Sequence, residues 1–177
     1  MLDDLQHNEE SAIQIKNAGL ILFHPFIITY FNKVGLLENN KFRTKMSTSR
    51  AILLLQWLAD GIVNHNNAVE PVLNKILCGT DLIETIPFDF TPTEQEKTVT
   101  NELVEIFKDR WPKMKNTSTE AIRSSFIIRD GTLNHCDDGW ILSVEQRGYD
   151  VLLQTLPWTL NYIKTPIMNK VLHVKWI

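Results

Sequence analysis

The chain has 177 residues, of which 44% are hydrophobic and 22% charged, and its net charge is −3 at pH 7. This composition is that of an ordinary globular protein, and it excludes disorder for the chain as a whole. The 18 lysines and arginines are scattered and form no basic stripe of the kind that neutralises phosphates, so nucleic-acid binding is disfavoured. We expect residues 1–12 to be a mobile, polar N-terminal segment. Residues 13–177 are expected to form a single globular domain, since domains reach about 250 residues.

Cysteine usage and apolar run lengths bear on the compartment. Cys78 lies in a leucine-rich stretch and Cys136 in a polar turn, which indicates free thiols of a reducing compartment and not a disulfide framework. The first fifteen residues lack a basic stretch followed by an apolar one, so no signal peptide is predicted. The longest apolar run, 51–55, is far shorter than the roughly 18–20 residues that a membrane span needs. We therefore expect no membrane association.

The first predicted helix covers about 25–34. Pro25 disfavours helix at His24, so we expect an extended or looped chain before it. The apolar residues that follow have helical spacing, and Gly35 is a typical helix end.

Two further helices are expected to form a hairpin. Ser and Thr residues at 47–49 are candidate caps for the first of them, and Gly61 is its predicted end. The apolar positions of 69–77 again have helical spacing, and Pro71 suits a first helical turn. The polar residues 63–68 would join the pair.

A fourth helix is predicted after an irregular segment, 80–90. Thr91 is its expected cap, with Pro92 in the first position and Glu94 completing a capping box, and the helix should break before Pro112. Its expected inward positions are Val99, Leu103, Ile106 and Phe107. The same capping pattern at 117–120 precedes a short helix in 121–126.

The apolar period changes from 3.6 to 2 residues near Phe126. The expected fold class is therefore α+β: a helical N-terminal two-thirds packed on a small antiparallel β-sheet near the C-terminus. Its strands are expected at about 125–129, 140–146 and 171–177, with a helix or broken helix between the last two.

The run His135, Cys136, Asp137 and Asp138 brings four ligand types together in a presumed hairpin turn. Neighbouring residues of an extended chain point to opposite sides, and no second CxxC or HxxxH completes a tetrahedral site. A solvated turn is favoured and no metal site is predicted.

No catalytic or cofactor-binding group is predicted, and we expect no enzyme. His24 lacks a nucleophile and is expected to contact a backbone carbonyl. Asp60, whose only near partner is His65, is expected to be a solvated carboxylate. Asp150 suits a helix N-terminus, which is a structural role.

The tryptophans divide into core and interface candidates. Trp140 and Trp176 share the inward phase of their strands and are expected in the core. Trp158 belongs to an apolar segment that two prolines interrupt, so part of this segment should stay exposed as an interface, unless the whole segment covers the sheet. The interface candidates are Leu156, Pro157, Trp158, Ile163, Pro166, Ile167 and Met168.

The ordered set of apolar blocks resembles the C-terminal region of the tape-measure proteins of contractile injection systems, the phage-tail-like particles of bacteria. The blocks lie at 17–37, 50–61, 73–79, 116–133 and 140–176. The resemblance implies a structural or assembly component that contacts tube, baseplate or spike proteins. It implies assembly in the cytoplasm and then a place within the particle.

The resemblance leaves the role of the chain open. A helix extends only about 1.5 Å per residue, and this chain has several breaks and a β-rich end. We therefore do not expect the chain by itself to form an extended rod that measures the length of the tube. An assembly or loading adaptor fits the residues equally well. An alternative from another class is a small-ligand or cargo-binding domain with a pocket between the helices and the sheet.

Overall fold

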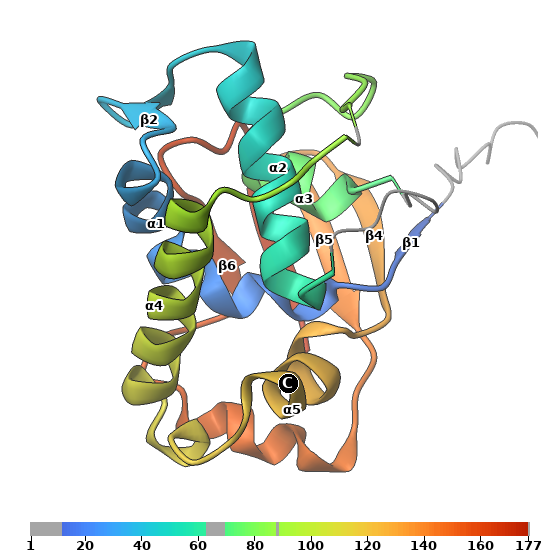
Figure 1. The fold of residues 1–177 in the computed structure, drawn as a ribbon. Helices are drawn as coiled ribbons and strands as arrows, with labels where there is room; N and C mark the ends of the chain where they lie inside the picture. Colours follow the sequence, from blue (N-terminus) through green and yellow to red (C-terminus); the bar gives the residue numbers. More distant parts are fainter. Residues whose placement is uncertain (1–11, 63–69, 88, 177) are drawn as a thin grey trace, which may run out of the picture.

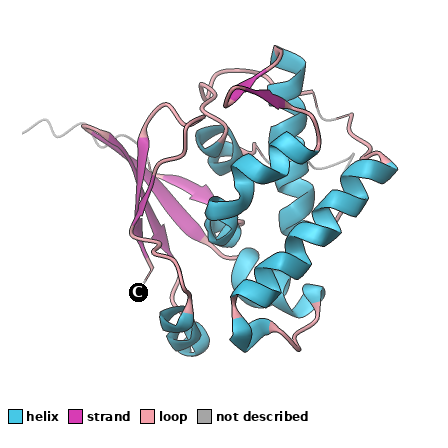
Figure 2. Ribbon diagram, turned by 90° about the vertical axis from the view of Figure 1, so that its left-hand side faces the viewer, coloured by secondary structure: helices cyan, strands magenta, loops and turns pink. Residues whose placement is uncertain are grey.

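Helices pack against one face of a β-sheet in the computed structural model, which describes residues 12–62, 70–87 and 89–176 (Figure 1). Seen from the side, the sheet forms one layer and the helices the other (Figure 2). The α+β fold class is thereby confirmed. The expected mobile segment 1–12 lies almost wholly outside the described residues.

The sheet has five strands in the order β1-β4-β5-β7-β6. Their bounds are β1 Ile13–Ile15, β4 Gly131–Cys136, β5 Gly139–Val144, β6 Tyr162–Ile163 and β7 Val171–Lys175. β4 and β5 form an antiparallel hairpin, in which β4 lies at Gly131–Cys136 and not at the expected 125–129. β5 and β7 pair in parallel, so the sheet is mixed. The reason is the long connection after β5, which returns to the end of the sheet where β5 began, as a parallel crossover requires.

The strand expected at 125–129 is wrong. α5 (Thr119–Ile122) continues instead into η3 (Arg123–Ile127), a short π-helix. Phe126 and Ile127 are buried there, and Phe126 packs on Trp111 with ring centroids 5.1 Å apart. A short apolar run fits a buried helix or a strand equally well, and tertiary packing selected the helix.

The looped segment expected before Pro25 is also wrong. η1 (Ala18–Phe26) is a 3-10 helix that includes Pro25 and leads directly into α1 (Ile27–Lys33). All residues of 18–23 are buried, so the backbone must satisfy its polar groups internally, which a helical turn does. η1 lies so close to η3 that a Cβ on Gly19 would sit 1.6 Å from the carbonyl oxygen of Phe126.

α2 (Lys45–Asp60) ends as expected at Gly61, whose φ of 72° is left-handed. Its cap is Thr44, three residues before the expected set, and Oγ1 of Thr44 accepts a hydrogen bond from the Ser47 amide at 3.0 Å. α3 (Val72–Leu77) packs beside α2, and Nδ2 of Asn74 donates to the Ile52 carbonyl at 3.0 Å. The expected hairpin connection, 63–68, lies outside the described residues.

α4 (Glu94–Arg110) begins two residues later than expected. Its capping box joins Thr93 and Glu96, and Glu96 also accepts from Nη2 of Arg50 at 2.6 Å. The pairing with Arg50 on α2 favours this start over the one at Thr91. Leu103 and Phe107 are buried as expected, whereas Ile106 is 41% exposed.

The remaining elements are short. A hairpin of β2 and β3 precedes α2, the 3-10 helix η2 follows α4, and the 3-10 helix η4 follows β5. Their bounds are β2 Leu37–Glu38, β3 Lys41–Phe42, η2 Pro112–Met114 and η4 Gly148–Thr155. η4 and the irregular chain after it occupy the place of the expected broken helix.

Candidate functional site

An open groove of about 370 Å³ lies in the helical layer. One wall comes from the end of η1 and from α1, the facing wall from α4, and the segment after η4 closes one side. The lining residues are mainly apolar or aromatic: Pro25, Phe26, Thr29, Tyr30, Lys33, Val99, Leu103, Ile106, Arg110, Pro157 and Trp158. Two interface candidates of the sequence analysis therefore line the groove.

Trp158 reaches the groove because the chain straightens after η4. Leu156 is extended at a ψ of 134°, and the next two residues carry the indole against the helices. Its ring meets Phe26 edge-on, with centroids 5.4 Å apart and planes at 89°, and lies 5.8 Å from Phe107. Its buried Nε1 has no hydrogen-bond partner among the described residues.

His24 fastens this segment to η1. Its Nε2 lies 3.0 Å from the carbonyl oxygen of Thr159, so the expected backbone partner is confirmed. Burial lowers the pKa of His24, and the bond to Thr159 opposes that shift only in part. The imidazole is therefore neutral and donates a hydrogen bond to the carbonyl. This bond holds Thr159, the residue after Trp158, in place.

Partly exposed apolar side chains give the groove its surface. Ile106 projects from α4, Pro157 is exposed and Trp158 is half-buried. Basic groups also line the hollow: Lys33, which lies 3.2 Å from Glu102, and Arg110 at the end of α4. The arrangement suits an apolar segment that carries acidic groups.

The other interface candidates do not line the groove, and Leu156, next to Pro157, is half-buried. Ile163 in β6 and Met168 are buried in the core. Pro166 is exposed and Ile167 half-buried, in the turn before β7. The seven candidates thus form no continuous surface. Pro157 and Trp158 share the groove with residues of η1, α1 and α4, which were not among the interface candidates. The half-exposed Ile106 on α4 gives no separate signal in the sequence, since its spacing fits a buried face.

Trp140 and Trp176 lie on the face of the sheet that packs against the helices, as expected. Trp176 is 1% exposed, and its Nε1 donates to Asp150 at 3.0 Å. Trp140 is half-buried against the core and meets His135 edge-on at 5.2 Å. Another, smaller hollow of about 210 Å³ lies beside Trp140, between the end of α3 and the sheet.

The acidic residues that the sequence singled out have backbone partners. Asp60 accepts from the Ile62 amide at 2.8 Å and from Gln56, while His65 lies outside the described residues. Asp150 accepts from the Arg147 amide at 2.9 Å at the start of η4, as expected. It also forms a buried ion pair with Arg129, which had no sequence signal.

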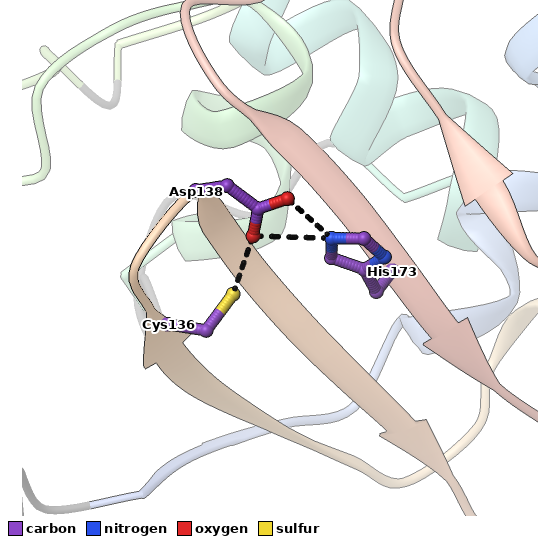
Figure 3. Close-up of side chains that lie close together, drawn as sticks. All are labelled: Cys136, Asp138 and His173. Atoms are coloured by element: carbon purple, nitrogen blue, oxygen red, sulfur yellow. Dashed lines mark hydrogen bonds and ion pairs between the residues drawn. The ribbon is translucent and has the colours of Figure 1, made fainter.

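The expected turn is confirmed at Asp137 and Asp138. The structure adds His173 of β7, whose Nε2 lies 3.0 Å from Oδ2 of Asp138, while the thiol of Cys136 donates to Oδ1 at 3.3 Å (Figure 3). Sequence reasoning missed His173 because it lies 35 residues from Asp138. Both cysteines are free thiols.

Comparison with known proteins decides the family. The family model of the contractile injection system tape measure protein matches residues 3–176, nearly the whole chain. The chain belongs to this family. Membership implies a component of an injection particle that associates with other parts of that particle. No curated protein and no solved structure matches the chain. Among the described residues, no helix has both the length and the apolar character that crossing a bilayer requires.

Proposed function

We propose that the chain is a non-enzymatic assembly component of a contractile injection particle and that it acts through protein–protein contacts. It would be assembled in the cytoplasm and then remain in the particle, bound to a tube, baseplate or spike protein. The observation that carries the proposal is the groove in which Trp158, Phe26 and Ile106 present apolar surface. Exposed apolar surface with an aromatic anchor is typical of interfaces.

The proposed occupant is an apolar segment of a partner protein flanked by acidic residues. The groove lies between the neighbouring helices α1 and α4, and its mainly apolar lining suits one inserted apolar element. Arg110 supplies positive charge at the groove, which complements acidic groups on the partner and steers the encounter, whereas Lys33 is already paired with Glu102.

An adaptor role is favoured over that of a ruler. The longest helix in the described part of the chain, α4, has 17 residues, and at about 1.5 Å per residue it spans roughly 25 Å. The mixed sheet and the packed helices make this part of the chain unable to extend along a tube without unfolding. The proposed function is therefore a docking module of the tape-measure component.

The test is a matched pair of substitutions. Ile106→Glu places a negative charge on the exposed part of the groove, whereas Ile83→Glu makes the same change at a residue that is 92% exposed and lies outside it. We expect Ile106→Glu to abolish co-purification with tube, baseplate or spike proteins and particle assembly, with the thermal midpoint nearly unchanged. Ile83→Glu should leave both intact. If both variants assemble like the parent chain, the groove is not the contact.

A small-ligand or cargo-binding adaptor is the second candidate. The groove volume of about 370 Å³ falls within the range of small-molecule pockets, about 300–1,000 Å³. A thermal-shift screen separates the two candidates. A ligand that raises the midpoint of the parent chain but not of Ile106→Glu would favour this alternative.

A further inference from the structure

Three side chains with metal-ligating atoms meet on the outer face of the sheet, away from the groove. Cys136 ends β4, Asp138 lies in the β4–β5 turn, and His173 lies in β7 (Figure 3). The sulfur, carboxylate oxygen and imidazole nitrogen all lie within 4.8 Å of one another. Two of the contacts are shorter: Asp138 lies 3.3 Å from Cys136 and 3.0 Å from His173.

Strand register explains why distant residues meet here. Cys136 pairs with Gly139 across the hairpin, and Gly139 pairs with Val171 in the parallel ladder. Paired residues share a face of the sheet, so Cys136 and His173, two residues beyond Val171, project from the same side. Gly139 lies between them without a side chain, and a Cβ there would sit 2.1 Å from the Val171 carbonyl oxygen.

We propose that Cys136, Asp138 and His173 bind a divalent transition-metal ion, with Zn²⁺ the best match. Thiolate, imidazole and carboxylate are the donors that Zn²⁺ takes, and three protein ligands with an open fourth position are one of its two common arrangements. Ca²⁺ and Mg²⁺ require more oxygen donors than this site offers. A thiolate and a carboxylate together carry the two negative charges that balance the ion.

The distances agree with a tetrahedral ion. Zinc bonds of about 2.0–2.3 Å at tetrahedral angles separate the donor atoms by roughly 3.3–3.6 Å. The contacts of Asp138 are already close to this range, and the remaining separation needs a shift of at most about 1.5 Å, given the 4.8 Å limit. His173 and Cys136 are half-buried and Asp138 is exposed, so the side chains have room to make this shift and water can reach the fourth position.

Tyr162 of β6 is a neighbour of the cluster, because its ring meets that of His173 edge-on with centroids 5.5 Å apart. Nζ of Lys170 lies 3.0 Å from Nε2 of His135, which faces the other side of the hairpin beside Trp140. The ion would tie the β4–β5 turn to β7, two segments 35 residues apart. Because it binds the folded chain alone, it would raise the stability of the sheet.

The test uses the full chain, stripped with a chelator and titrated with Zn²⁺ in competition with a chromogenic chelator. We expect one equivalent to bind and to raise the thermal midpoint. Co²⁺ in place of Zn²⁺ should produce the thiolate-to-cobalt charge-transfer band and the intense visible bands of a tetrahedral site. Cys136→Ser, Asp138→Asn and His173→Gln should each lower the Zn²⁺ affinity by at least about a hundredfold, since losing even a residue that supports a ligand costs about 10–100-fold.

Two substitutions of the same residue types serve as matched controls. Asp137→Asn and His135→Gln change the neighbouring carboxylate and imidazole, which lie outside the cluster, and should leave the affinity within about twofold. The proposal is overturned if the parent chain binds no Zn²⁺ or its Co²⁺ form lacks the thiolate band. It is also overturned if the controls weaken binding as much as the cluster variants do.

Discussion

Arg129 and Asp150 form a buried ion pair, in which Nη1 of Arg129 lies 3.1 Å from Oδ2 of Asp150 and Nη2 bonds to Oδ1. The two side chains are 0% and 6% exposed. Arg129 also donates to the carbonyls of Ser125 and Glu145, and Asp150 accepts from Trp176. The pair therefore joins η3, the end of β5, η4 and the chain after β7, at the place where the helical layer meets the sheet.

Removing one partner of this pair should be strongly destabilising. We expect Asp150→Ala to lower the free energy of unfolding by about 3–5 kcal/mol, because the guanidinium of Arg129 is left buried without its counter-charge. Urea unfolding followed by circular dichroism measures the change. Asp130→Ala is the control, since Asp130 makes only a 3.8 Å contact with Lys16 at the surface, and it should cost less than about 1 kcal/mol. Equal losses in the two variants would contradict the role of the buried pair.

Stability should fall in acid. Burial alone would raise the pKa of Asp150, but the hydrogen bonds from Arg129, the Arg147 amide and Trp176 outweigh it and hold the pKa below its usual value. The pKa of Glu96 is lowered in the same way. Burial would raise it, but the hydrogen bonds from Arg50 and Thr93 outweigh the effect of burial. A lowered folded-state pKa contributes stability that is complete above the unfolded pKa, about 4, and is lost as the pH falls through the folded value.

The free energy of unfolding should therefore decrease slightly as the pH falls below about 6.5, because the lowered pKa of His24 opposes its protonation in the folded state, and should decrease further below about pH 4 as the carboxylates are protonated. Urea titrations at a series of pH values test this, and Asp150→Asn should flatten the acid limb because the carboxylate of Asp150 no longer titrates. An unchanged slope in that variant would assign the acid sensitivity to other groups.

Trp158→Ala separates a packing role from a binding role. The indole is half-buried against Phe26 and Phe107, so we expect a loss of about 2 kcal/mol, below the roughly 3–5 kcal/mol of a fully buried aromatic residue. The domain should stay folded at room temperature while partner binding is lost. Trp158→Phe should keep the edge-on contact and restore most of the stability. A fully stable Trp158→Ala variant that assembles normally would exclude both roles.

Gly19 should tolerate no side chain. A Cβ there would lie 1.6 Å from the Phe126 carbonyl oxygen, a backbone atom, so Gly19→Ala must separate η1 from η3. We expect a loss of about 3 kcal/mol or more, at the upper end for overpacking. Gly148→Ala is the control: a Cβ there meets nothing within 4 Å, and the change should be neutral or slightly stabilising. Thermal unfolding of the two variants measures the difference.

Local patterns in the sequence determined much of this fold. The two-residue period of β5 and β7 correctly predicted which side chains of these strands are buried, including that of Trp176. Gly61 ended α2 in the left-handed conformation, and Asp137 and Asp138 formed the hairpin turn. These features depend on backbone conformation and hydrogen bonds within a few residues, so a short stretch of sequence contains their physical cause.

Tertiary structure decided the rest. Burial against distant elements made a helix of the residues before Pro25, where the local pattern favoured a loop, and kept 125–127 helical, where a strand was expected. The length and path of the connection after Val144 made β7 parallel to β5, and that register brought His173 to Cys136 and Asp138. Arg129 and Asp150 are 21 residues apart in the sequence, and their pairing exists only once the layers have packed. Desolvation and contact between distant residues are properties of the folded molecule, and no short stretch of sequence contains both partners.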